Sequence, residues 1–400
     1  MARYTLGIRA AVATAAALAV VLPAAPAAAD SMRQREWWLQ TLHVAEAQRI
    51  TTGTGVVVAV LDTGVQADHP DLAGQVLDGV RVTGEDDKGR VDHQNHGTGV
   101  AGLIAATGKG PTGGLGIAPG AKILPVTVYT NGFGGSDLAP AIRWAVDHGA
   151  KVINISQAYN QTLPEDEAAV RYALDHDVVI VASVGNVEQG NTQVASPASI
   201  PGVIAVSAID RNGKFWSGSA KGPQVVLSAP GVDMAVLTRR TPTGAVGGYG
   251  LVPGGTSASA PIVAGAAALV RAKYPKLHAA DVINRLIATA DDAGPPGRDP
   301  EYGFGRLNLL RALQADVPPV AANPLGEPGA TADAAPPAAS RSMLPRRALV
   351  VLAVVAVVAV LMILLVVLVV VLLVRRGRRR PPTGPYGPAP VRGPDVRADR

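Results

Sequence analysis

A β-branched apolar run, Val56-Val57-Val58-Ala59-Val60-Leu61-Asp62, ends in a carboxylate just before the turn residues Thr63 and Gly64. Five similar runs follow along the chain. Near-continuous apolar segments of this kind are typical of strands buried on both faces of a parallel sheet. We therefore predict further strands at Lys122–Val128, Val152–Ser156, Val178–Ser183, Val203–Ala208 and Val225–Ala229.

Helical patterns alternate with these runs, which predicts an α/β fold with a mostly parallel central sheet and helices on both faces. In such sheets ligands bind at the carboxyl ends of the strands. The predicted helices cover His96–Ala106, Ser136–His148, Leu163–His176, Ser257–Lys273 and Ala279–Ala290.

Two apolar segments outside this region indicate the compartment. Residues 1–29 have two arginines, a short apolar run and an Ala-Ala-Ala end, the layout of a secretory signal peptide. Residues 348–374 are wholly apolar and long enough to cross a bilayer with tilt. Arginines are denser after this segment than before it, which predicts a single-pass protein of the cell membrane with a cytoplasmic C-terminus.

Charge and composition exclude several classes of protein. Of the net charge of +5, residues 375–400 contribute +6, Arg3 and Arg9 +2, and arginines 341, 346 and 347 +3, which leaves −6 for residues 30–340. Because nucleic-acid binding requires a basic surface on the folded domain, we predict no nucleic-acid partner. The chain has no cysteine, which excludes disulfides and a thiolate nucleophile. No sequence pattern predicts a metal site or a cofactor.

Three motifs lie where ligand chemistry is expected. Asp62 ends the first strand, and His96 begins a helix within His-Gly-Thr-Gly-Val-Ala-Gly. Ser257 follows Gly254-Gly255-Thr256 at a helix N-terminus, where free N–H groups favour negative charge. Each motif alone has a structural explanation: a turn aspartate, an ordinary histidine and an N-cap serine. Together, in the order Asp-His-Ser, they indicate nucleophilic catalysis.

These motifs resemble the catalytic signatures of the subtilisin-like serine proteases, the subtilases. The resemblance covers residues 53 to about 313 and implies a subtilisin-like fold and serine endopeptidase activity. It implies that Ser257 is the nucleophile, His96 the general base and Asp62 the group that orients the imidazole. It also implies that Asn186 contributes to the oxyanion hole. The loop containing His69 and Asp71 is expected to be structural, and so is Asp92.

The resemblance further implies a substrate-binding edge on either side of the cleft. Its residues are Ser156, Gln157 and Ala158 on one segment and Ser183, Val184 and Gly185 on the other. The family usually has glycine in place of Ala158 and Tyr159, and alanine is common in place of Val184. The larger side chains predict a narrow specificity pocket, with either a preference for small residues or poor general proteolysis. Broad cleavage of casein beside large aromatic residues would contradict this prediction.

A narrower resemblance is to the mycosins, membrane-anchored subtilases associated with type VII secretion. It implies a signal peptide (1–29), an N-terminal extension (30–52), a catalytic domain (53–314), a Pro/Ala-rich linker (315–347), a transmembrane helix (348–374) and a basic Pro-rich cytoplasmic tail (375–400). Trp37, Trp38, Leu39 and Leu42 are expected to form a packed helix and not a removable inhibitor.

The resulting functional hypothesis is an extracytoplasmic endopeptidase that processes secreted proteins and is associated with membrane components of a type VII secretion system. The alternative is a structural component of the secretion apparatus whose catalysis is dispensable. A third hypothesis, a protease that processes lantibiotic-type precursors, has the same chemistry and differs only in its substrate.

Overall fold

A parallel sheet forms the centre of the protein. The structure is a computed structural model that describes residues 32–82, 85–109, 113–128, 137–240 and 243–329. In these residues seven strands lie in the order β2-β3-β1-β4-β5-β6-β7, and every neighbouring pair is parallel. They are β1 (Val57–Asp62), β2 (Val80–Arg81), β3 (Lys122–Thr127), β4 (Val152–Ile155), β5 (Val179–Ser183), β6 (Ile204–Ile209) and β7 (Leu227–Pro230).

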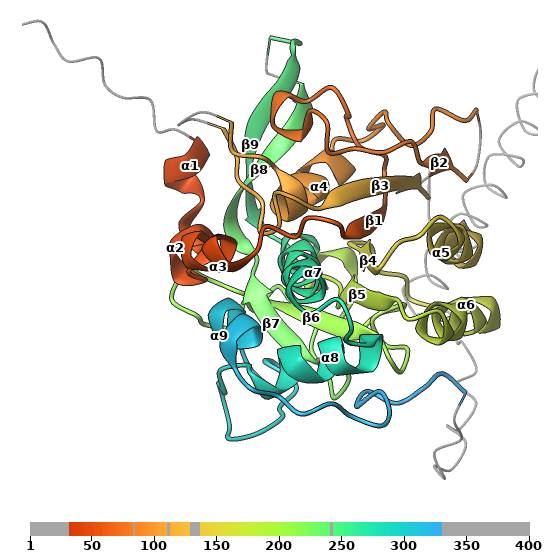
Figure 1. The fold of residues 1–400 in the computed structure, drawn as a ribbon, viewed down its shortest axis with the longest axis vertical. Coiled ribbons are helices and arrows are strands. Elements are labelled where there is room, and N and C mark those ends of the chain that lie inside the picture. The colour runs from red at the N-terminus through yellow and green to blue at the C-terminus, as the bar shows by residue number, and fades with distance from the viewer. Residues whose placement is uncertain (1–31, 83–84, 110–112, 129–136, 241–242, 330–400) are drawn as a thin grey trace, which may run out of the picture. The chain divides into compact units, whose positions relative to one another are not determined.

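The predicted strands are all present, with ends displaced by at most two residues, and β2 is an additional short edge strand. Every residue of β5 and β6 is buried, as a sheet covered on both faces requires. One covering pair of helices is α4 (Gly97–Ala105) and α7 (Thr256–Lys273), which pack against each other; the other is α5 (Leu138–Asp147) and α6 (Pro164–Asp175) (Figure 1). The predicted α/β architecture is therefore confirmed.

Helix α7 is buried on almost all sides because its residues are small. Alanine, glycine and serine dominate its sequence, so neighbouring elements approach the helix axis closely. Pro261 lies inside the helix and has no N–H to donate to the carbonyl of Ser257, four residues earlier. That carbonyl instead accepts a hydrogen bond from the Ser156 hydroxyl, at 3.0 Å. The helix start is thereby linked to the segment that follows β4.

An antiparallel hairpin, which the sequence patterns did not predict, connects β7 to α7. It consists of β8 (Val232–Arg240) and β9 (Val246–Gly254), and Figure 1 shows it extending away from the central sheet. His69 Nε2 is 3.1 Å from the carbonyl oxygen of Gly248, and the Tyr249 hydroxyl donates to Asp71 at 2.9 Å. His69 and Asp71, both buried, therefore anchor the hairpin, which agrees with the structural role predicted for their loop.

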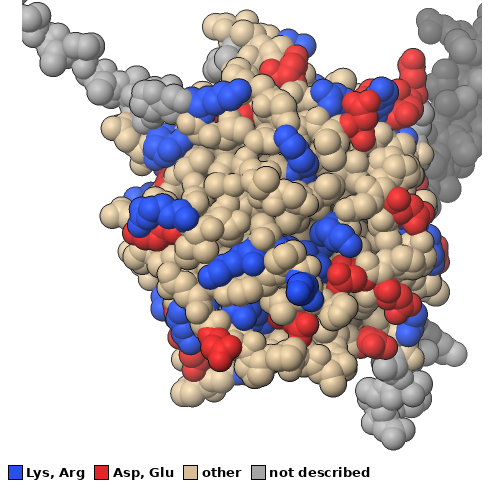
Figure 2. Space-filling view, viewed as in Figure 1, with Lys and Arg blue, Asp and Glu red and all other residues tan. Residues whose placement is uncertain are grey.

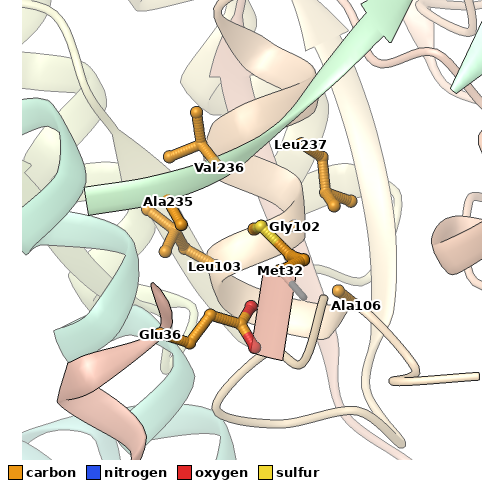
Figure 3. A pocket seen from close by; sticks show the side chains of 8 residues that line it. All are labelled: Met32, Glu36, Gly102, Leu103, Ala106, Ala235, Val236 and Leu237. Atoms are coloured by element: carbon orange, nitrogen blue, oxygen red, sulfur yellow. The ribbon is translucent and has the colours of Figure 1, made fainter. Parts of the chain in front are cut away.

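The N-terminal extension packs on the domain through three short helices, α1 (Met32–Arg35), α2 (Trp37–Thr41) and α3 (Val44–Ile50). Trp38 is fully buried and Leu42 is 6% exposed, while Trp37 and Leu39 lie against the core, so the expected packed helix is present. Figure 3 shows Met32 and Glu36 beside side chains of α4 and β8.

Two buried carboxylates hold a single loop against this extension. Glu36 accepts the N–H of Leu115 at 2.9 Å, and Asp71 accepts the N–H of Gly114 at 2.8 Å. Arg33 pairs with Glu36 at 3.2 Å and donates to the carbonyl of Gly113 at 3.0 Å. Burial raises the pKa of Glu36 to about 7, although the hydrogen bond from Leu115 and the charge of Arg33 both act to lower it. We call these contacts the carboxylate clasp.

The C-terminal helices α8 (Ala279–Ala288) and α9 (Leu309–Gln314) complete the described domain. The first residues of the predicted linker pack on the domain, whereas the sequence predicted that the whole linker would be a spacer. Val320 N–H donates to Asp281 of α8 at 2.9 Å, and Gly202 N–H donates to the carbonyl of Leu325 at 3.2 Å. These backbone groups find partners on the domain, so residues 315–329 are not a free spacer.

The predicted signal peptide, the transmembrane helix, the cytoplasmic tail and the rest of the linker lie outside the described residues. Among the helices that the structure describes, none has the length and apolar character needed to cross a membrane. Figure 2 shows one face of the molecule, on which basic and acidic side chains are interspersed, as on an ordinary solvated surface.

Candidate active site

The first two predicted catalytic residues are in direct contact. Asp62 is the last residue of β1 and is fully buried, and His96 immediately precedes α4. His96 Nδ1 lies 2.7 Å from Asp62 Oδ1, which also accepts the N–H of Thr63 at 2.7 Å. A carboxylate only accepts hydrogen bonds, so it fixes the proton on Nδ1 and leaves Nε2 free to accept one.

This contact also changes the basicity of the imidazole. Burial acts to lower the pKa of His96, but the charge and hydrogen bond of Asp62, together with the charge of Asp92, outweigh it, so the pKa is raised. The side chain is 40% exposed, so part of the ring is accessible. A partly exposed imidazole with a raised pKa is a suitable general base.

Asp92, expected from the sequence to be a structural loop residue, is the centre of a hydrogen-bond network. It is fully buried, and its carboxylate accepts hydrogen bonds from Thr63, Thr98 and the backbone of Gln94 and Asn95. Thr63 in turn accepts the N–H of Gly97 at 2.9 Å. This network fixes the turn that carries His96. The neighbouring His93 instead pairs with Asp87, at 2.6 Å.

The third predicted residue, Ser257, is half-buried in the first turn of α7. Its carbonyl is held by Ser156, whereas its hydroxyl forms no hydrogen bond to any residue that the structure describes, His96 included. In proteins without bound substrate such catalytic hydrogen bonds are often long and form only in the complex. Since α4 and α7 pack together, the two helix starts that carry His96 and Ser257 belong to one packed unit.

Asn186 is oriented by the residue beside Ser257. Its Oδ1 accepts both the N–H and the hydroxyl of Thr256, each at 3.0 Å. The amide nitrogen therefore faces away from Thr256, and it donates to Gln189 at 3.2 Å. An amide N–H₂ group beside a helix N-terminus is a suitable donor pair for an oxygen that develops negative charge.

The predicted substrate-binding residues follow two adjacent parallel strands. Ser156, Gln157 and Ala158 follow β4, and Val184 and Gly185 follow Ser183 at the end of β5, so both segments lie at the carboxyl edge of the sheet. Val184 is fully buried. The Tyr159 hydroxyl donates to Gln157 at 2.6 Å, which links two side chains of the segment after β4.

Several residues around the site carried weak sequence signals. Thr63 and Thr256 are common turn and cap residues, and only the structure reveals their hydrogen bonds to Asp92 and Asn186. The hairpin residue Arg239 also contacts the His96 loop, donating to the carbonyl of Asp92 at 2.8 Å. The hairpin has no alternating sequence signal of its own, since residues 232–240 read Val-Asp-Met-Ala-Val-Leu-Thr-Arg-Arg.

Comparison with known proteins places this site in a family. The model of the subtilase family matches residues 53–305. Fervidolysin of Fervidobacterium pennivorans is 36% identical over 319 residues, which are 72% of this chain and 45% of that protein. Thermitase of Thermoactinomyces vulgaris is 36% identical over 282 residues, which are 70% of this chain and 96% of thermitase.

Solved structures give the same result. The crystal structure of MycP1 with the N-terminal propeptide removed has a TM-score of 0.64 and 31% identity, covering 71% of this chain and 98% of that one. The MycP3 protease from the type VII (ESX-3) secretion system has a TM-score of 0.60 and 32% identity, covering 70% and 88%. The family match spans more than half of the sequence and includes every predicted site residue. The chain therefore belongs to the subtilase family of serine endopeptidases.

Proposed function

We propose that this protein is a membrane-anchored endopeptidase that cleaves secreted proteins outside the cytoplasm, using Asp62, His96 and Ser257. The observation that carries the proposal is the 2.7 Å hydrogen bond from His96 to the buried Asp62. The helix that follows His96 packs against α7, which carries Ser257 in its first turn. The free Nε2 of His96 provides the base that a serine hydroxyl requires.

Acylation begins when Ser257 Oγ attacks the carbonyl carbon of the peptide bond. As the C–O bond forms, His96 Nε2 takes the hydroxyl proton, and the carbonyl electron pair moves onto oxygen. Asp62 stabilises the resulting imidazolium. When the C–N bond breaks, His96 returns the proton to the departing amine, which leaves an acyl group on Ser257.

Deacylation repeats these steps with water as the nucleophile. His96 takes a proton from water, whose oxygen attacks the acyl carbon, and the proton then passes to Ser257 Oγ as the ester bond breaks. In both halves of the reaction, Asn186 and the N–H of Ser257 donate to the negatively charged oxygen. Thr256 fixes the oxygen side of the Asn186 amide before substrate binds, which directs the amide nitrogen away from Thr256.

The proposed setting is a type VII secretion system. The similar structure MycP1 is described as an essential component of the type VII (ESX-1) secretion system, and MycP3 as a protease of the ESX-3 system. The apolar residues 348–374, with the flanking arginines, support a single membrane anchor with the C-terminus in the cytoplasm.

Membrane attachment is tested by fractionation of cells that produce the full chain or a chain ending at residue 347. We expect the full chain to sediment with membranes and to resist extraction by high salt, whereas the shortened chain is released. Equal distribution of the two proteins would contradict the proposed anchor.

The catalytic proposal is tested with a fluorophosphonate probe, which forms a covalent bond only with an activated serine. We expect one adduct on the purified full chain, and peptide mass spectrometry is expected to locate it at Ser257. A folded protein that forms no adduct, or an adduct at another serine, would contradict the assignment.

A further inference from the structure

Two buried polar atoms beside the Asp62–His96 pair have no hydrogen-bond partner among the described residues. One is Oδ2 of Asp62, the carboxylate oxygen that His96 does not contact, and the other is the hydroxyl oxygen of Thr127, the last residue of β3. Both side chains are fully buried. Because a buried carboxylate oxygen without a donor is costly, a partner for Oδ2 is expected in the folded protein.

The sheet register places these two side chains next to each other. Asp62 and Thr127 are partners in the parallel pair β1 and β3, which lie side by side in Figure 1. Neighbouring strands are about 4.8 Å apart, and partners in register point to the same face of the sheet. The Thr127 hydroxyl is turned toward the turn after Asp62, since a Cβ atom at Gly64 would lie 3.1 Å from it.

Other hydroxyls close to this turn are already occupied. Thr63 and Thr98 donate theirs to the two carboxylate oxygens of Asp92. Thr127 is therefore the neighbouring hydroxyl that remains to serve Oδ2 of Asp62. The two atoms form no direct hydrogen bond, and a single water molecule spans a separation somewhat longer than a direct bond.

We infer that Thr127 is a positioning residue, whose hydroxyl holds the second carboxylate oxygen of Asp62 through one enclosed water molecule. The inference rests on the proposed endopeptidase function. The water donates to Oδ2 and accepts from the Thr127 hydroxyl. A carboxylate held at both oxygens cannot rotate, so Oδ1 stays directed at Nδ1 of His96.

The same link affects the basicity of the imidazole. The charged groups around it are Asp62 on β1, Asp92 in the loop before α4, and Arg239 of β8, which contacts the Asp92 carbonyl. A donor on Oδ2 draws negative charge away from Oδ1. Without that donor, Asp62 attracts the imidazolium more strongly, and the pKa of His96 should rise further. Because neutral imidazole is the reactive form, serine reactivity should then be lost at a higher pH.

The test measures the rate of fluorophosphonate labelling of the full chain as a function of pH. Thr127→Val removes the hydroxyl, nearly keeps the shape and suits a strand. We expect the plateau rate to fall by about 10-fold, the value of one hydrogen bond to a charged group. We expect the acidic limb to move to higher pH by about half a unit. Thr127→Ser, which keeps a hydroxyl, should restore both.

Thr107 provides the matched control. Its hydroxyl oxygen is also buried and without a partner among the described residues, but it lies just beyond the far end of α4 from His96. Thr107→Val should therefore change neither the plateau rate nor the acidic limb. An acidic limb that stays in place in Thr127→Val, or that Thr127→Ser fails to restore, would overturn the inference.

A titration that needs no reaction separates this inference from the proposed catalysis. The Nδ1 proton of a histidine bonded to a carboxylate gives a proton resonance far downfield, and its loss in His96→Gln identifies that of His96. Following this resonance with pH in the full chain reports the pKa of His96 directly. We expect a higher value in Thr127→Val than in the unaltered protein, and equal values would overturn the inference. Failure of the unaltered chain to react with the fluorophosphonate would instead contradict the proposed function alone.

Discussion

Replacing Ser257 by alanine is expected to lower kcat for peptide hydrolysis by about 10⁶-fold, the loss that removal of the nucleophile causes in the related enzyme subtilisin. The alanine cannot form the acyl-enzyme, and His96 then has no hydroxyl to deprotonate. The proposed substrate contacts along Ser156–Ala158 are unaltered, so KM should change little. The measurement is kcat and KM on a quenched fluorescent peptide, at enzyme concentrations high enough to detect the residual rate.

Ser259 offers a matched control in the same helix. It is fully buried two residues after Ser257, and its hydroxyl has no hydrogen-bond partner among the described residues. Ser259→Ala should retain activity because it removes only this unpaired group. Activity within an order of magnitude of the original in Ser257→Ala would contradict the assignment of the nucleophile.

The same variant distinguishes the enzyme from a structural component of the secretion apparatus. If substrate processing alone explains the role, secretion should be impaired as severely by Ser257→Ala as by removal of the protein. Secretion that survives Ser257→Ala but not deletion would support the structural alternative.

Asp62→Asn is expected to lower kcat/KM by about 10⁴-fold. An asparagine can present its amide N–H to Nδ1 and so stabilise the wrong tautomer, with the proton on Nε2. It also removes the negative charge that raises the pKa of His96. Catalysis requires neutral His96, so wild-type activity falls as the pH decreases through this raised pKa. In Asp62→Asn the residual activity should therefore persist to lower pH.

The measurement is the pH profile of kcat/KM for both proteins, and a second pair on the surface provides the control. His93 Nε2 lies 2.6 Å from Asp87 Oδ2, outside the site. Asp87→Asn should therefore leave the pH profile of kcat/KM unchanged. An acidic limb that stays in place in Asp62→Asn would contradict the proposed coupling.

The core of the fold was predictable because burial leaves a strong pattern in the sequence. Strands such as β5 are buried at every position and are apolar at every position before their last residue, Ser183. The hairpin of β8 and β9 was not predicted, because one side of it is exposed and β9 contains four glycines and a proline. These residues are unfavourable in strands, and here pairing with β8 and docking on His69 outweigh their low propensity.

The site was predictable only as far as its residues have distinctive sequence neighbours. Asp62, His96 and Ser257 lie in such motifs, whereas Asp92 lies in an ordinary loop. Asp92 is an anchor because Thr63, 29 residues earlier, lies against it. Such tertiary contacts have no local signature.

The carboxylate clasp has a consequence for the compartment in which the protein works. A disulfide that fixed the N-terminal extension would depend on the thiol potential of its surroundings. Glu36 and Asp71 hold the loop at Gly114 and Leu115 without sulfur, so reductants leave the attachment intact. Because the pKa of Glu36 is raised, its contribution to stability is fully present below the ordinary value of 4.5 and is lost as the pH rises through about 7. The extension is thus attached by a contact that responds to acidity and is indifferent to redox conditions.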